Sequence, residues 1–221
     1  MLLLVIDTST PAVTAAVAEV SAGGEHAVLA QLVTVDARRH AELLAPSLEA
    51  VLAQAAAAPA DIDAIVAGVG PGPYTGLRVG LMTAAALADA LARPTYGVCS
   101  LDAIAYAAPP HDGGLLVATD ARRREVYWAA YDRERRVAGP AVNHPRGVDT
   151  TRCTVAAGAG AALYAEVFGL PIVDPAYPSA AGLAALAAAR ATAGAPAEPL
   201  TPMYLRRPDA AEPTAPKAVL P

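Results

Sequence analysis

The fold of this chain is most constrained by a repeated order of strand-like segments, each series opening with an apolar run that stops at an aspartate. Residues 2–6 are continuously apolar and end at Asp7, and residues 115–119 end at Asp120. Apolar runs without alternation are typical of strands buried on both faces of a sheet. The sequence therefore predicts two related halves, each with a central strand that delivers an aspartate to a loop.

The segments after each central strand follow the same order, more weakly in the second half. In the first half we predict strands at 12–20 and 27–35, a helix from Arg39 to Ala55, a strand at 62–69 and a helix at 77–91. In the second half we predict strands at 125–131, near Val137 and at 153–157, then helices at 161–168 and 179–192. We therefore expect an α/β protein with halves at 1–108 and 109–200 and a Pro-rich tail at 201–221.

Composition and charge narrow the classes of function. The 221 residues include 16 basic and 21 acidic side chains, which give a net charge of -5. A negative net charge is unfavourable for direct binding of a nucleic-acid phosphate backbone. No uncharged run reaches the roughly 18 residues of a membrane span, and the first residues show no basic leader. Cys99 and Cys153 lie far apart, which favours a reducing compartment. We expect a cytoplasmic protein without membrane contact.

The glycine-rich stretch from Gly70 to Gly76 is the sharpest local motif. Glycines and prolines between a buried strand and a helix allow a tight turn with outward-facing amides, which can bind a phosphate. No Lys-Ser/Thr pair follows the last glycine, so the stretch is not a Walker A loop. A purely structural connection between strand and helix is the alternative.

The two loop aspartates suggest a weak nucleotide site. Actin-like ATPases and sugar kinases place two acid-bearing loops around the phosphates and the metal of a nucleotide, and turn-forming or helix-capping roles are the alternative. Arg122, Arg123 and Arg124 are bulky where a phosphate loop favours glycine. The weak candidates for this site are Asp7, Thr8, Ser9, Gly70, Gly72, Thr75, Gly76 and Asp120.

Local signatures of catalysis or of a metal site are not found in the sequence. The four histidines are scattered, with no HExxH motif and no pair four residues apart, and no GxSxG elbow is present. We expect no catalytic residue, no metal and no cofactor.

Small residues recur on the helix after the glycine-rich loop, with Gly80, Ala84 and Ala88 at four-residue spacing. Such a stripe lets helices approach closely, so it predicts a partner helix, with packing on the chain's own sheet as the alternative. The candidate interface residues, on this helix and the preceding one, are His40, Leu44, Leu48, Leu77, Gly80, Leu81, Ala84 and Ala88.

Together, five segments resemble the TsaB (YeaZ-like) family of bacterial tRNA threonylcarbamoyladenosine synthesis. They are residues 3–9, 39–44, 70–80, 120–127 and 202–206, and the Gly-Pro-Gly-x-x-Thr-Gly-x-Arg stretch among them is the most specific. Pro73-Tyr74 stands where Ser-Phe is commoner in the family. The resemblance implies the actin-like (ASKHA) fold of two ribonuclease H-like βββαβα halves with mixed sheets.

The resemblance also implies a non-catalytic role. The catalytic paralogue, TsaD, binds metal through a His-x-x-x-His pair at a position where this chain has Ser100 and Ile104, which cannot replace imidazoles. The family implies a scaffold that forms a heterodimer with TsaD, supports binding of the TsaE ATPase, reaches tRNA only through the complex, and forms a homodimer when isolated. The alternatives are an actin-like enzyme of sugar-kinase or metallopeptidase type using Asp7 and Asp120, and a nucleotide-binding regulatory module.

Overall fold

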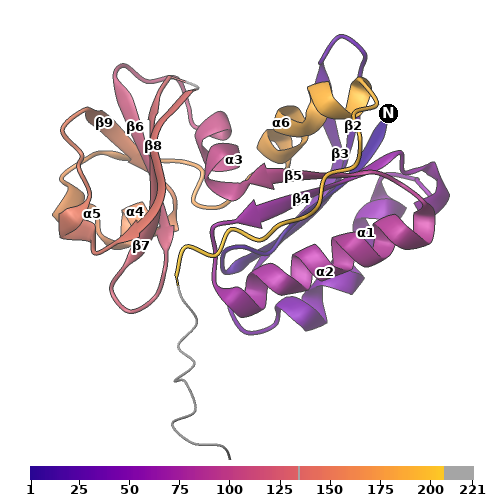
Figure 1. The fold of residues 1–221 in the computed structure, drawn as a ribbon, viewed down its shortest axis with the longest axis horizontal. Helices are drawn as coiled ribbons and strands as arrows, with labels where there is room; N and C mark the ends of the chain where they lie inside the picture. Colours follow the sequence, from indigo (N-terminus) through magenta and orange to yellow (C-terminus); the bar gives the residue numbers. More distant parts are fainter. Residues whose placement is uncertain (134, 207–221) are drawn as a thin grey trace, which may run out of the picture.

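The computed structural model describes residues 1–133 and 135–206, which form two lobes lying side by side (Figure 1). Each lobe is built on a five-stranded mixed sheet, in the orders β3-β2-β1-β4-β5 and β10-β9-β6-β7-β8. In each sheet the central strand pairs antiparallel with the next strand of the chain and parallel with the fourth strand of its lobe. The two sheets have the same topology, so the predicted duplication and the actin-like α/β class are confirmed.

The first lobe begins with the strands β1 (Leu2–Asp7), β2 (Ala12–Val20) and β3 (His26–Val35). The helix α1 (His40–Gln54) follows, and after a 3-10 turn (Pro59–Asp61) come the strand β4 (Ala64–Gly70) and the helix α2 (Tyr74–Leu91). The strand β5 (Thr95–Cys99) and the helix α3 (Ser100–Ala107) complete the series. Pro46 lies inside α1, in its second turn. The predicted strands and helices of this half are confirmed to within a few residues.

The second lobe contains β6 (Gly114–Asp120), β7 (Val126–Asp132), β8 (Arg135–Asn143), β9 (Cys153–Ala157) and the short β10 (Ile172–Val173). A 3-10 turn (Pro145–Gly147) follows β8, and α4 (Ala159–Leu163) and α5 (Ala165–Phe168) replace the single helix expected at 161–168. The backbone leaves the helical region at Tyr164, which separates the two. The last helix is α6 (Ala180–Thr192).

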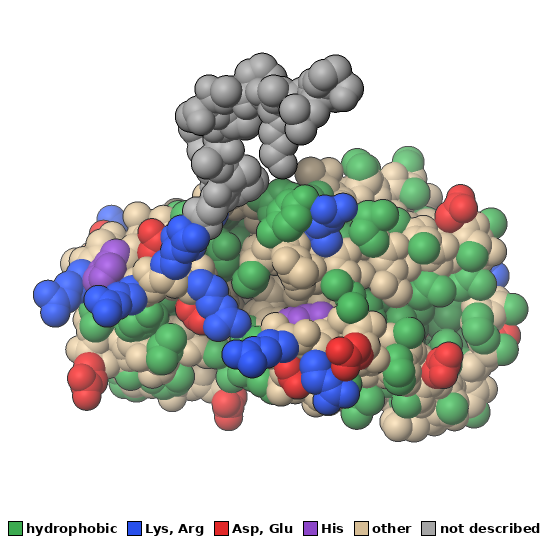
Figure 2. All heavy atoms as spheres, turned by 90° about the horizontal axis from the view of Figure 1, so that it is seen from below, with side chains coloured by type: hydrophobic (Ala, Val, Ile, Leu, Met, Phe, Trp, Pro, Cys, Tyr) green, Lys and Arg blue, Asp and Glu red, His purple; other side chains and the backbone are tan. Residues whose placement is uncertain are grey.

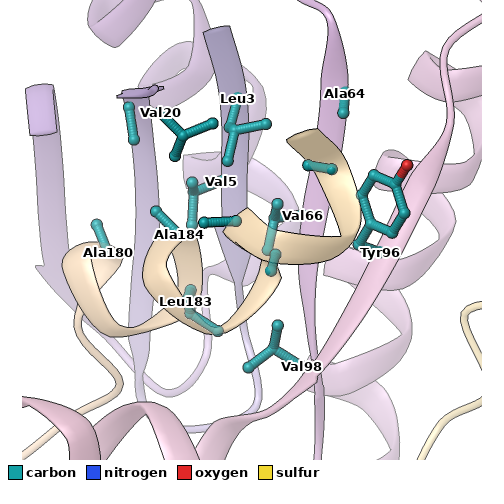
Figure 3. Close-up of a cluster of buried hydrophobic side chains, with 14 of the residues drawn as sticks. Leu3, Val5, Val20, Ala64, Val66, Tyr96, Val98, Ala180, Leu183 and Ala184 are labelled. Atoms are coloured by element: carbon teal, nitrogen blue, oxygen red, sulfur yellow. The ribbon is translucent and has the colours of Figure 1, made fainter. Parts of the chain in front are cut away.

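The helix α6 lies on the first lobe, although the sequence analysis assigned it to the second half. Its apolar face packs on the first sheet, with Leu183 and Ala184 against Leu3, Val5 and Val66 (Figure 3). The reason is physical: α1 and α2 cover the other face of that sheet, and this face needs a helix of its own. The second sheet is covered by α3 on one face and by α4 and α5 on the other.

The chain after α6 runs back across the first lobe in an extended conformation. The N–H of Glu198 donates to the carbonyl of Thr95 (2.9 Å), and the N–H of Met203 donates to that of Val69 (2.8 Å). This segment, 195–206, therefore covers the edge strand β5. The remainder of the expected tail, 207–221, lies outside the described residues.

Among residues 1–133 and 135–206, we find no helix with the length and apolar character needed to cross a bilayer.

Candidate functional site at the junction of the two lobes

The carboxylate of Asp7 is enclosed by its own chain. Its Oδ1 accepts hydrogen bonds from the N–H and the hydroxyl of Ser9 (2.9 and 2.8 Å), and its Oδ2 accepts one from the hydroxyl of Ser100 (2.6 Å). A Cβ at Gly68 would come within 1.7 Å of Oδ2, so only glycine leaves room for this carboxylate. Burial raises the pKa of Asp7, while the Ser100 and Ser9 hydrogen bonds and the charge of His40 oppose the rise.

Thr8 ties the loop after β1 to the start of α2. Its hydroxyl donates to the carbonyl of Gly76 (2.7 Å) and accepts from the N–H of Gly80 (2.9 Å). In a regular α-helix those two backbone groups would pair with each other, four residues apart. The hydroxyl can come this close because Gly80 and Gly76 have no side chains. A Cβ at Gly80 would lie 2.4 Å from the hydroxyl oxygen, and one at Gly76 would lie 2.9 Å from the carbonyl oxygen of Thr8.

The glycine-rich loop packs against the same segment. A Cβ at Gly72 would lie 2.2 Å from the carbonyl oxygen of Ser9, so the backbone of the loop packs directly on the backbone at Ser9. Gly70 has a φ of +94°, which a residue with a side chain adopts only with strain. These glycines allow close packing within the first lobe. This is the role expected if the stretch is a structural connection between a strand and a helix and not a phosphate-binding loop.

The second aspartate, Asp120, lies across a small cavity from the first lobe. The cavity is about 90 Å³ in volume, well below the roughly 300 Å³ at which ligand pockets begin. Of the candidate nucleotide residues, the structure brings Thr8, Thr75, Gly76 and Asp120 to this cavity, whereas Asp7, Ser9, Gly70 and Gly72 do not line it. The lining residues are Thr8, Thr10, Pro11, Ala37, His40, Pro73, Thr75, Gly76, Asp120 and Arg122.

The loop after Asp120 has an unusual backbone. Arg122, Arg123 and Arg124 all have positive φ, at 63°, 52° and 63°. Oδ1 of Asp120 accepts from the N–H of Arg122 (2.8 Å), which is the turn-forming role given above as the alternative for this aspartate. The carboxylate therefore caps its own loop, and its second oxygen lies 3.8 Å from the guanidinium of Arg122.

The residues chosen as the partner interface are buried in the first lobe, which corrects this prediction for all of them except Leu81 and Ala88. These two also line a groove between α2 and the segment 195–206. The stripe of small residues faces Thr8 and the sheet, and His40 bonds the carbonyl of Thr10 through Nε2 (2.8 Å). In an amphipathic helix the regularly spaced residues are those that face its own sheet. The buried set comprises His40, Leu44, Leu48, Leu77, Gly80, Leu81, Ala84 and Ala88.

Ser100 and Ile104, where the resemblance places the metal ligands of the paralogue, make contacts within the chain. The hydroxyl of Ser100 bonds Asp7 and accepts from the N–H of Gly70 (3.2 Å), and Ile104 is fully buried in the core between α3 and the second sheet. Among residues 1–133 and 135–206, no three His, Cys, Asp or Glu side chains are grouped so as to hold a metal ion.

A polar cluster that no sequence motif indicated joins α3 to the strands β7 and β8 of the second sheet. Asp102 accepts from the hydroxyl of Tyr131 (2.7 Å) and from the guanidinium of Arg136 (2.9 Å). Burial, followed by the charge of Asp102, raises the pKa of the neighbouring Cys99 thiol to about 11, so this cysteine is a poor nucleophile at neutral pH. The partners are 29 and 34 residues from Asp102, and no local pattern signals such contacts.

Comparisons with known proteins agree with the fold. The family model described as TsaD, tRNA N6-adenosine threonylcarbamoyltransferase, matches residues 27–210. A solved structure titled YeaZ from Pseudomonas aeruginosa superimposes with a TM-score of 0.74 at 30% identity, covering 92% of this chain and 99% of that one.

Two relatives show how far the similarity extends in sequence. An uncharacterised protein of Mycobacterium tuberculosis is 53% identical over 207 residues, covering 94% of this chain and 92% of the relative. The Escherichia coli tRNA threonylcarbamoyladenosine biosynthesis protein TsaB is 35% identical over 136 residues, 61% of this chain and 56% of that protein. With a family model matched over most of its length and a YeaZ structure matched nearly from end to end, the chain belongs to the TsaD family and to its YeaZ-like (TsaB) branch.

Proposed function

We propose that this chain takes part in tRNA threonylcarbamoyladenosine synthesis as a non-catalytic subunit that forms a heterodimer with a TsaD transferase. The observation that carries the proposal is the enclosure of Asp7, Ser100 and Ile104 in internal contacts at the junction of the lobes. A carboxylate with three internal hydrogen bonds and an isoleucine in an apolar core leave no ligand set for a metal or a nucleotide phosphate at this point.

The surface for the partner is the solvent-facing side of α2. The helix has 18 residues, of which only Arg78 and Asp89 are charged. Its buried side already packs on the sheet, yet its outer side presents Met82, which is 61% exposed, beside the exposed Ala85 and Ala86. An exposed helix face that is this apolar is typical of an interaction surface.

A groove beside this face extends the surface. It has a volume of about 360 Å³ and lies between α2 and the extended segment 195–206, with Met82 and Ala85 on one wall and Leu200 and Pro202 on the other. A helix of the partner that packs on α2 would bury both walls. The same surface would serve the homodimer of the isolated chain, and the assembled pair would bind the TsaE ATPase in the cytoplasm.

The test is capture of the TsaD paralogue from the same organism by the purified chain, with Met82→Asp as the variant. We expect Met82→Asp to fold normally and to lose capture, because a carboxylate would be buried in an apolar interface. The control is Leu163→Asp on α4, a side chain that is also 61% exposed but lies on the other lobe. Unchanged capture by Met82→Asp would disprove the assignment of the surface.

The catalytic alternatives predict a different result. An enzyme of sugar-kinase or metallopeptidase type would hydrolyse ATP or a peptide when purified alone. We expect no such activity from this chain, and we expect tRNA threonylcarbamoylation in the reconstituted system to need both this chain and TsaD. Modification that proceeds at an equal rate without this chain would contradict the proposal.

A further inference from the structure

Arginines are concentrated around the cavity between the lobes, in contrast to the acidic character of the whole chain. Arg122 lines the cavity, Arg38 and Arg39 lie between its lining residues Ala37 and His40, and Arg206 contacts the loop that carries Arg122 through the carbonyl of Ala121 (3.3 Å). We call this surface the basic rim and define it as Arg38, Arg39, Arg78, Arg122–Arg124 and Arg206. Figure 2 shows Lys and Arg side chains gathered beside a hollow on this face.

The loop of Arg122, Arg123 and Arg124 holds its arginines outward in a fixed turn. The N–H of Ala121 donates to the carbonyl of Glu125 (3.0 Å), and the N–H of Glu125 donates to that of Arg122 (3.0 Å). Three consecutive residues with side chains in the left-handed region are unfavourable, and such strain persists only where the surroundings hold it and is concentrated at functional sites. All three are exposed.

Carboxylates neutralise the basic rim only in part. Glu42 pairs with Arg39 (2.9 Å), Glu125 with Arg206 (2.6 Å) and Asp120, more loosely, with Arg122 (3.8 Å). All three pairs are partly or largely exposed to solvent. Exposed pairs of this kind contribute little energy and can exchange for another anion. Within residues 1–133 and 135–206, Arg38 and Arg124 form no salt bridge. The surface therefore retains positive charge for a ligand.

Two exposed tyrosines stand at the edge of the basic rim. Tyr74 follows Pro73 and precedes Thr75, which both line the cavity, and its ring lies 5.0 Å from that of Tyr204. The guanidinium of Arg78 lies 5.1 Å from the centre of the Tyr74 ring. The tyrosines are 51% and 39% exposed, so ring surface is open to solvent. Arginines with exposed aromatic rings are the combination by which proteins bind unpaired RNA strands, through phosphates and base stacking.

We propose that the basic rim is a binding site for RNA, contacting the sugar–phosphate backbone through its arginines, with Tyr74 and Tyr204 as a platform for an unpaired base. The family resemblance implied that RNA is reached only through the complex, and the net charge of the chain disfavoured direct binding. The net charge, however, averages over an uneven distribution. The choice of a tRNA as the RNA rests on the proposed function.

The test is binding of an unmodified transcript of an ANN-decoding tRNA to the isolated chain, measured by fluorescence anisotropy between 50 and 200 mM salt. The variant is Arg122→Ala/Arg124→Ala. The matched control, Arg135→Ala/Arg152→Ala, removes the same charge at the opposite end of the second sheet, where β8 and β9 begin. Circular dichroism checks that all variants fold.

We expect the rim variant to bind the transcript about tenfold more weakly at low salt and to lower the slope of log affinity against log salt by about 1.5, since each lost phosphate contact removes roughly 0.7 to 0.9. The control should match the unaltered chain. Equal losses in both variants, or no binding by the unaltered chain at 50 mM salt, would overturn the proposal.

A third result would also overturn it: a rim variant that loses TsaD capture but binds RNA normally, which would assign the arginines to an acidic protein surface. The RNA measurement uses the isolated chain without TsaD. A negative result for RNA binding therefore does not depend on whether the chain captures TsaD. Arg122 and Arg124 do not line the groove of the partner surface, which Arg78, Met82 and Tyr204 share, so the rim variant should keep TsaD capture.

Discussion

The hydroxyl of Thr8 lies between two backbone groups of α2, accepting from the N–H of Gly80 at 2.9 Å and donating to the carbonyl of Gly76 at 2.7 Å. The contact joins residues 72 positions apart in the chain and accounts for the glycine at each helical position. It holds the loop after β1 against α2 at the floor of the cavity between the lobes.

Replacing Thr8 by valine tests the strength of this connection. The substitution keeps the shape of the side chain but leaves the N–H of Gly80 and the carbonyl of Gly76 without the hydroxyl. We expect the free energy of unfolding to fall by about 1–3 kcal/mol, the cost of unsatisfied buried polar groups. Urea denaturation measures it. Thr75→Val, at an exposed position of the same helix, should change stability by less than about 0.5 kcal/mol.

A tryptophan at Ala84 tests the correction to the interface residues. Ala84 is fully buried against the first sheet, so Ala84→Trp should overpack the core and cost about 1–3 kcal/mol or more, with a lower melting temperature. The next residue, Ala85, is exposed. We expect Ala85→Trp to keep the melting temperature and to impair capture of the TsaD partner. A stable Ala84→Trp variant that fails only in capture would restore the first assignment.

The pH dependence of stability tests the enclosure of Asp7. Burial raises its pKa in the folded state above the unfolded value, so the folded state holds the proton to higher pH. The stability from this group is therefore complete below the unfolded pKa of about 3.9 and is lost as pH rises through the raised folded pKa. The Asp7→Asn variant has no titrating group at this position, so its stability does not show this decrease with rising pH.

The comparison is made by urea denaturation of both chains from pH 4 to pH 8. We expect the stability of Asp7→Asn relative to the unaltered chain to increase with pH. A difference that stays constant over this range would show that Asp7 has the same proton affinity in the folded and unfolded states.

A nucleotide-binding measurement tests whether the glycine-rich loop at residues 70–76 is packed too closely to admit phosphates. The cavity of about 90 Å³ and the backbone contacts of Gly72 and Gly76 leave no space for phosphates beside Thr8. We expect calorimetric titration of the isolated chain with ATP and Mg²⁺ to give a dissociation constant above about 1 mM. A micromolar constant would mean that the lobes separate to admit the nucleotide, and it would favour the regulatory-module alternative.

The local order of strands and helices was determined by the sequence itself. Leu3, Leu4 and Val5 form a strand buried on both faces, and the helical period after Arg39 persists through Pro46, because each signal depends on residues close together in the chain. The duplication followed from Asp7 and Asp120, which end equivalent central strands. The loop at residues 70–76 was also marked in the sequence, since clustered glycines and prolines are typical of the turn between a strand and a helix.

What the tertiary structure decided is which surface each of these residues faces. A stripe such as Gly80, Ala84 and Ala88 fits a partner helix as well as the chain's own sheet, and only the position of Thr8 makes the second arrangement the actual one. Likewise α6 lies on the first sheet because that face was otherwise uncovered, and Arg206 contacts the loop of Arg122 through the carbonyl of Ala121 despite their separation in sequence. Packing partners and charge distribution depend on contacts between distant segments, which local periodicity and net charge do not record.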